Sequence, residues 1–111
     1  MNTNWSILSL ECKTSENGLS NVVYKVYWKC TLTEIIGEKT YSSEISSCSI
    51  IPSPDINNFT QYELLTKEQV ITWVLDTIGD QNLQEFYKLL QNDLNEQISP
   101  TVINLTPPWN N

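Results

Sequence analysis

The side chains that could do chemistry in this chain are mainly carboxylates, because it has thirteen Asp and Glu residues and no His. Without an imidazole, general acid–base work would fall to carboxylates, and a close pair of them is the arrangement that hydrolyses glycosides. Most acids of the second half fall on the outer faces of expected helices, where solvated carboxylates are common, and no two share a cleft. The sequence therefore predicts a protein that is not an enzyme and has no catalytic residues. The acids in question are Glu63, Glu68, Asp76, Asp80, Glu85, Asp93 and Glu96.

The cysteine and glycine patterns predict no metal site and no cofactor. Cys12, Cys30 and Cys48 form no C-x-x-C pair, and they lie in strand-like segments, where a reduced thiol behaves as a small hydrophobic residue. The segment "DINNF" begins like a calcium loop, but Phe59 stands where an oxygen ligand is required. With only three glycines in the chain, loops that bind phosphate or a dinucleotide are not expected either.

The net charge of −7 is concentrated in the second half of the chain. Residues 1–51 hold five acids and four lysines, whereas residues 52–111 hold eight acids and two lysines. This distribution argues against nucleic acid or an anionic membrane as a partner, because both are bound through Lys and Arg. No apolar run approaches the roughly 20 residues that cross a bilayer, and "MNTNWS" lacks the features of a signal peptide. We therefore expect a soluble protein with one domain.

Residues 1–51 are predicted to form three β-strands. Side chains that are β-branched or aromatic are frequent there, and in the segment "NVVYKVYWKCTLT" they alternate with polar ones. Matching the apolar faces predicts a first hairpin with a three-residue loop, Glu16–Gly18, and a second in which Glu34 pairs with Lys39. The result is an antiparallel meander with the second strand in the middle.

Two helices are predicted to cover one face of this meander. Thr66, followed three residues later by Gln69, is a capping-box pattern, and Gly79 is placed to end the first helix. A second apolar stripe at helical spacing continues to about residue 98, before Pro100. The expected fold is α+β with one domain: a three-stranded meander (1–51), a loop (52–65), a helical hairpin (66–98) and an extended C-terminal tail (99–111).

The outer face of the predicted sheet carries large apolar side chains, which can mark a binding surface. The expected register places Ile7 opposite Tyr27 and Val23 opposite Ile50 on this face, with Trp5 near Lys29. We take the five apolar residues among them as a candidate interface. The alternative is that the tail, or the loop before the helices, crosses this face and covers it.

The segment "INLTPPWNN" is more apolar than a disordered linker usually is. Pro107, Pro108 and Trp109 are expected to anchor the tail, with the prolines fixing an extended turn that lays the indole on the core. Truncation at Thr106 should then lower the melting temperature by several degrees. The alternative is a short proline-rich ligand for a partner's groove, although the repeated P-x-x-P spacing is missing.

In this order, the segments "NWSIL", "NVVYKVYWKC", "FTQYELLTKEQVITWVLDTIG" and "SPTVINLTPPW" resemble a small protein family of tailed bacteriophages, notably phages of marine cyanobacteria. The resemblance covers most of the chain. Its most specific part is an L-T-x-x-x-V-x-x-W-V helix, within residues 64–74, combined with a Pro-Trp C-terminus at Pro108 and Trp109. The resemblance implies a phage accessory protein, associated with the virion, and it implies no activity or catalytic residue. The second helix departs from the family pattern because it is longer and more apolar, which favours an additional oligomeric contact.

The expected function is that of a non-enzymatic phage accessory protein that acts by protein–protein binding in the virion, at the tail or capsid. The alternative is an early host-takeover protein of the host cytoplasm, which binds and inhibits a host factor through the acidic helical half. The expected partner is a protein in either case: a virion component, a host factor, or a second copy of the chain in a homo-oligomer. Nucleic acid, membrane and cofactors are not expected partners.

Overall fold

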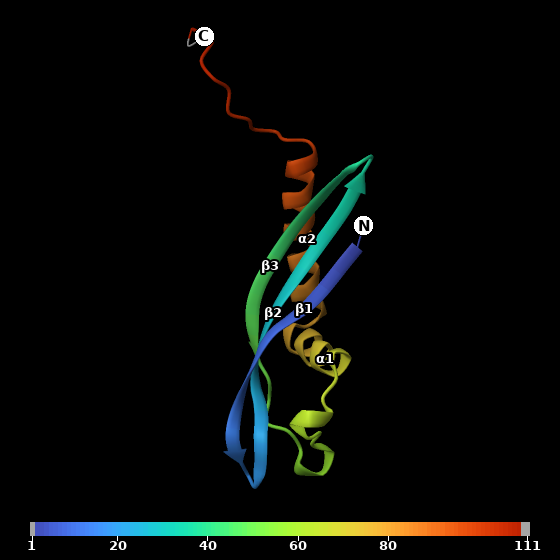
Figure 1. Cartoon of the computed structure of the whole chain (residues 1–111), viewed down its shortest axis with the longest axis vertical. Coiled ribbons are helices and arrows are strands. Elements are labelled where there is room, and N and C mark those ends of the chain that lie inside the picture. Colours follow the sequence, from blue (N-terminus) through green and yellow to red (C-terminus); the bar gives the residue numbers. More distant parts are fainter. Residues whose placement is uncertain (1, 110–111) are drawn as a thin grey trace.

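The computed structural model of the chain describes residues 2–109 and contains one sheet, two short 3-10 helices and two α-helices (Figure 1). The strands are antiparallel in the order β1-β2-β3, so β2 lies in the middle as predicted. The α+β fold class is confirmed, while positions 1, 110 and 111 of the expected domain lie outside the described residues. The elements are β1 (Asn2–Glu16), β2 (Leu19–Ile36), β3 (Lys39–Ile50), η1 (Ile56–Asn58), η2 (Tyr62–Leu64), α1 (Lys67–Ile78) and α2 (Asp80–Ile98).

The first hairpin differs from the predicted three-residue loop, because only Asn17 and Gly18 join β1 to β2. Both residues have positive φ, 51° and 83°, which is the conformation of a type I′ turn. Farther along the hairpin, Tyr24 in β2 and Leu8 in β1 have no partner in the ladder and form β-bulges. The two bulges shift the register by one residue in opposite directions. No constant register could therefore describe this hairpin.

The second hairpin is also tighter than predicted. Ile36 pairs with Lys39, so a two-residue turn begins at Gly37, and Glu34 pairs with Tyr41 instead of Lys39. Gly37 has a φ of 63°, as the first central position of a type II′ turn requires. The predicted register is therefore wrong by two residues. Because side chains alternate with a period of two, this error leaves the side chains of β3 on the predicted faces.

The core lies between β2 and the two helices. Val26, Trp28 and Cys30 of β2 are at most 1% exposed, and their alternate positions place them on one face of the strand. α1 adds Val74 and α2 adds Leu94 to the same cluster, both fully buried. In each helix the buried residues recur at a spacing of four, as a single apolar stripe requires.

Two serines of β3 belong to this packed side of the molecule. Ser49 accepts a hydrogen bond from the Trp28 indole at 3.0 Å, and Ser43 donates one to the backbone carbonyl of Leu90 at 2.8 Å. Both serines are buried, and each hydroxyl has a hydrogen-bond partner, as buried polar groups require. The serine-rich strand β3 therefore contributes to the core, because two serines of its inner face hydrogen-bond the central Trp28 and α2.

The predicted helix boundaries are confirmed within one residue. The Thr66 side chain accepts a hydrogen bond from the backbone N–H of Gln69 at 3.2 Å, which caps the start of α1. Gly79 ends α1 with φ 82° and ψ 153°, a conformation that is essentially limited to glycine. α2 follows directly and ends at Ile98, two residues before Pro100.

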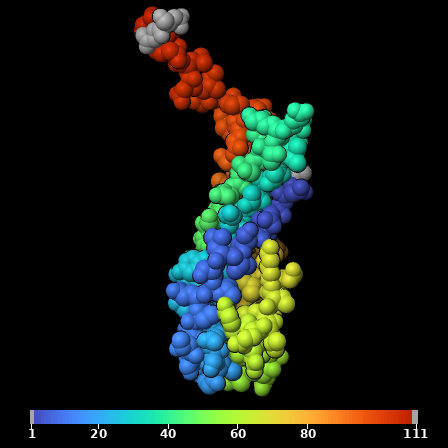
Figure 2. All heavy atoms as spheres, in the orientation of Figure 1, coloured from blue at the N-terminus to red at the C-terminus, as the bar shows by residue number. Residues whose placement is uncertain are grey.

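The molecule is elongated. Its radius of gyration is 19.7 Å, whereas a compact domain of this length has about 13 Å, and its extents are 72 × 27 × 26 Å. The segment after α2 leaves the body at one end, while α1 and the loop before it lie toward the other end (Figures 1 and 2). Among the described residues, the helices are too short or too polar to cross a membrane.

Candidate functional site

The five residues of the predicted interface do not share one face of the sheet. Trp5 and Ile7 pack against the core, and Val23 is a core residue that is only 7% exposed. Tyr27 and Ile50 lie on the outer face, where Ile50 is 60% exposed. The prediction of one continuous apolar surface is therefore wrong. The physical reason is the pair of β-bulges, which reverse the alternation and turn three of the five side chains inward.

Lysines and tyrosines occupy part of the outer face instead. The ammonium group of Lys25 lies 5.3 Å from the ring centroid of Tyr27, and that of Lys13 lies 5.8 Å from the centroid of Tyr24. A hydrogen bond with Glu11 is the main cause that raises the pKa of Tyr24, and a hydrogen bond with Tyr27 raises the pKa of Lys25. Because these charged and aromatic groups are engaged with one another, this part of the outer face is not the strongest candidate for binding.

Residues 102–109, which we call the apolar tail, expose several large apolar side chains. The exposed fractions are 80% for Val102, 63% for Ile103, 78% for Leu105 and 81% for Trp109. In Figure 2 this segment projects away from the body. The prediction that Pro107, Pro108 and Trp109 anchor the tail on the core is therefore wrong. The reason is that the chain runs away from the core after α2 (Figure 1).

The start of the tail is held in place by Glu96 of α2. The Glu96 carboxylate accepts hydrogen bonds from the backbone N–H of Thr101 at 2.7 Å and from its hydroxyl at 3.0 Å. The backbone hydrogen bond is the largest of the causes that lower the pKa of Glu96. The carboxylate is charged at neutral pH, so it holds Thr101 against α2, and the residues that follow run away from α1 (Figure 1).

Near the other end of the molecule, two adjoining cavities form what we call the groove. Both have Ile51, Pro52 and Trp73 in their walls, and their volumes are about 250 Å³ and 450 Å³. The smaller cavity lies between the start of β2, the loop 52–60 and α1; Asn21, which lines it, has a φ of 53°. Its walls are mainly apolar with a few polar groups, which is the usual composition of a binding pocket.

Gln69 and Thr60 connect two walls of the smaller cavity. The Gln69 side-chain amide donates a hydrogen bond to the Thr60 hydroxyl at 3.0 Å, so it does not complete the capping box that the sequence predicted. The sequence placed Trp73 in the core stripe and assigned no site to the loop. The signal that could have pointed to the groove is the loop itself, with its two prolines and Phe59, because binding residues are often on loops that a rigid scaffold positions.

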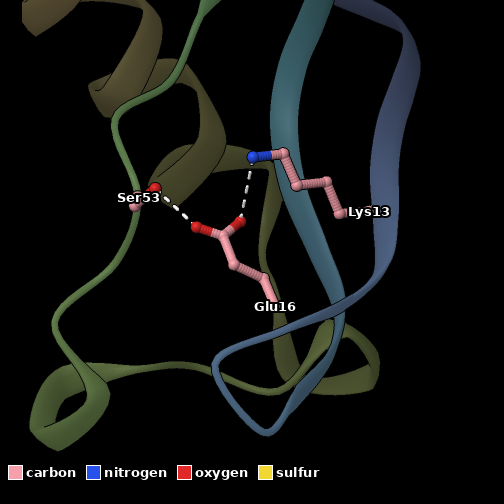
Figure 3. Close-up of polar contacts among 3 residues, drawn as sticks. All are labelled: Lys13, Glu16 and Ser53. Carbon is pink, nitrogen blue, oxygen red and sulfur yellow. Dashed lines mark hydrogen bonds and ion pairs between the residues drawn. The ribbon is translucent and has the colours of Figure 1, made fainter.

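A second polar contact holds the loop against the first hairpin (Figure 3). Ser53 donates a hydrogen bond to Oε1 of Glu16 at 2.6 Å. The ammonium group of Lys13 lies 3.3 Å from Oε2, an oxygen that receives no hydrogen bond from the described residues. The hydrogen bond from Ser53 is the main cause that lowers the pKa of Glu16, and Lys13 adds to it. Ser53 lies between two prolines of the groove wall, so this contact fixes the wall as well.

Glu16→Gln is expected to destabilise the protein at neutral pH, and the loss should disappear in acid. A carboxyl whose pKa is lowered by folding contributes stability above its unfolded pKa of about 4.3, and this contribution is lost as the pH falls through the lower folded value. Denaturant unfolding of the two proteins between neutral pH and about pH 3 measures the difference. Glu38→Gln, an exposed carboxylate in the other hairpin turn, is the matched control. A pH-independent difference between wild type and Glu16→Gln would contradict this account.

The other side chains that could react or bind a metal, the cysteines and the remaining acids, are dispersed over the molecule. Burial raises the pKa of the Cys30 thiol to about 11 and also raises that of Cys12, so both thiols are protonated at neutral pH and are weak nucleophiles. Cys48 is exposed on the third strand. Within residues 2–109, the structure holds no group of three or more Cys, Asp and Glu side chains placed to bind a metal ion. The strongest candidates for a functional role are therefore the groove and the apolar tail.

Fold and surface together define a small α+β protein whose open sheet carries two helices, with a groove beside α1 and an apolar tail beyond α2. The chain belongs to a protein family described as "Domain of unknown function (DUF7936)", which matches residues 1–109. No curated protein and no solved structure matches the chain.

Proposed function

We propose that this protein acts by contact with another protein and not by catalysis, and that the apolar tail makes the contact. The observation that carries the proposal is the exposure of four large apolar side chains, between 63% and 81%, in a segment that begins at a fixed point on α2. Soluble monomers rarely expose contiguous apolar surface unless it binds something. Burial of the indole and its neighbours in a partner would stabilise a complex by several kcal/mol.

The resemblance to a phage family supplies the setting of the proposal. Under it, the protein is an accessory protein of a tailed phage, and it is associated with the virion at the tail or capsid. The pattern that carries the resemblance includes Pro108 and Trp109, which are part of the apolar tail. The same residues that define the resemblance would therefore make the contact.

A second candidate function is supported by the charge of the helices. Asp76, Asp80 and Asp93 are exposed, and residues 52–111 hold eight acids against two lysines. Such a surface would suit a basic region of a host factor, as in a protein of the host cytoplasm that inhibits it early in infection. Glu96, another acid of this half, is engaged by Thr101, so its neutralisation would also disturb the tail.

A photo-crosslinking amino acid at position 109 tests the proposed function. In cells or particles that contain the protein at its natural level, we expect one discrete crosslinked species from position 109. The control carries the photo-crosslinking amino acid at position 64 instead, where Leu64 is 68% exposed but lies outside the tail. It should give no crosslinked species. Neutralisation of Asp80 and Asp93, two exposed acids of α2 that do not line the groove, should leave the crosslink unchanged. Identical patterns from positions 109 and 64 would overturn the role of the tail, and a crosslink lost on neutralisation would favour the second candidate.

A further inference from the structure

We propose that the apolar tail of one copy inserts into the groove of a second copy, with Trp109 bound between the loop 52–60 and α1. Each copy carries one tail and one groove, so two copies exchange tails reciprocally. The inference rests on the proposed function, because the same tail makes the contact, and it names the partner as this chain itself.

The size of the groove suits an indole. An apolar cavity of roughly 150 Å³ holds a benzene molecule, and the smaller cavity of the groove has about 250 Å³. Val22, Phe59 and Trp73 provide apolar and aromatic walls for the rings. The adjoining cavity, of about 450 Å³, gives the residues that precede Trp109 a continuous path along α1.

The polar groups of the groove also suit this occupant. A buried indole N–H requires an acceptor, and Asp55 and Asn58 both line the smaller cavity. Asp55 already accepts a hydrogen bond from the backbone of Asn57, but a carboxylate has further lone pairs available. Residues 99–109 contain no charged side chain, so the acids beside the groove, Asp55 and Asp76, do not repel the tail. An anionic ligand would meet repulsion from the same carboxylates.

The tail does not reach the groove of its own chain while Thr101 is held by Glu96. Eight residues follow Thr101 up to Trp109, and they span at most about 28 Å when fully extended. α2 alone, Asp80–Ile98, is about 28 Å long, and the groove lies beyond its start, on α1. The tail also leaves α2 in the direction away from α1 (Figure 1). A second copy is therefore the source of the tail that fills the groove.

The positions of the tail and the groove allow a closed pair. They lie toward opposite ends of a molecule whose longest extent is 72 Å, so two antiparallel copies bring each tail to the other copy's groove. Such an arrangement has twofold symmetry and uses both tails and both grooves. One indole buries about 150–250 Å². Two tails with their other apolar side chains, together with the two groove surfaces they cover, approach the roughly 1,200 Å² that a specific interface needs.

Sedimentation velocity of the purified full chain over a concentration series tests the inference. We expect a monomer–dimer equilibrium in the wild type, and Trp109→Ala should raise the dissociation constant by at least about tenfold, as for the loss of an aromatic hot spot. Leu64→Ala, which removes an exposed leucine outside the tail and groove, should leave it unchanged. Gln69→Trp, which fills the groove with an indole of the same chain, should raise the dissociation constant to a similar extent. A mixture of Trp109→Ala and Gln69→Trp should form a weak heterodimer, because one intact tail meets one intact groove.

A peptide with the sequence of residues 101–109 gives a test that does not depend on the folding of any groove variant. It should bind the Trp109→Ala protein at one site per chain in calorimetry and dissociate the wild-type dimer. A wild type that is monomeric at all concentrations and fails to bind the peptide would overturn the inference. A dimer that survives Trp109→Ala would overturn it too. If the crosslink from position 109 to another protein persists in either case, the proposed function stands and only the identity of the partner is wrong.

Discussion

Replacement of Trp28 with alanine is expected to lower the free energy of unfolding by about 3–5 kcal/mol, the range found when a buried aromatic side chain is removed from a core. Trp28 is 1% exposed, and its ring centroid lies 5.1 Å from that of Trp5 and 5.9 Å from that of Phe86. The variant also leaves the buried Ser49 hydroxyl without the indole that donates to it. Urea unfolding followed by circular dichroism measures the loss, which should also lower the melting temperature by more than about 10 °C.

Trp109→Ala is the matched control, because it removes the same side chain from a position that is 81% exposed. It should change the free energy of unfolding by less than about 0.5 kcal/mol, the usual effect of a surface substitution. The comparison must be made at a concentration below the dissociation constant of any dimer, since association adds stability to the wild type. If Trp109→Ala destabilised the monomer as Trp28→Ala does, the tail would pack on its own core, and the account of an exposed tail would be wrong.

Leu94→Ala is expected to lower the free energy of unfolding by about 2–5 kcal/mol, because it opens a cavity where α2 packs on the sheet. The Leu94 side chain is fully buried and belongs to the cluster that includes Val74 and Cys30. Leu89 lies in the same helix but is 60% exposed, so Leu89→Ala changes the helix propensity equally without opening a cavity. The control should lose less than about 0.5 kcal/mol. Equal losses in the two variants would contradict the assignment of this helix face to the core.

The element types and the fold class could be predicted from the sequence because they follow from local chemistry. Alternation in β2 and stripes at helical spacing identify the faces that must be buried, and Thr66 and Gly79 mark the limits of α1. The register could not be predicted in the same way. Leu8 and Tyr24 form bulges without any residue type that demands them, and the parity argument assumes that none exist. The interface prediction failed for this reason, since it depended on the register.

The groove and the orientation of the tail depend on tertiary structure, which short patterns do not encode. The loop that walls the groove has little periodicity, and its position follows from contacts such as that between Ser53 and Glu16, far apart in the chain. For the tail, the apolar composition favours burial of Trp109 but does not say whether its own core or another molecule covers it. The tail starts at the contact between Glu96 and Thr101 and leads away from its own core (Figure 1). This contact joins the end of α2 to a segment without regular structure, so no sequence period predicts it.

The most direct test of the central claim, that the tail of one copy occupies the groove of another, is a crosslink between isotopically distinct chains. Chains labelled with ¹⁵N and carrying a photo-crosslinking residue at position 109 are mixed with unlabelled Trp109→Ala chains, irradiated and analysed by mass spectrometry. We predict crosslinked peptides that join the labelled tail to unlabelled residues of the loop 52–60 or α1, around Thr60, Gln69 and Trp73. Crosslinks confined to a single labelled chain, or joined to the outer face of the sheet, would contradict the account.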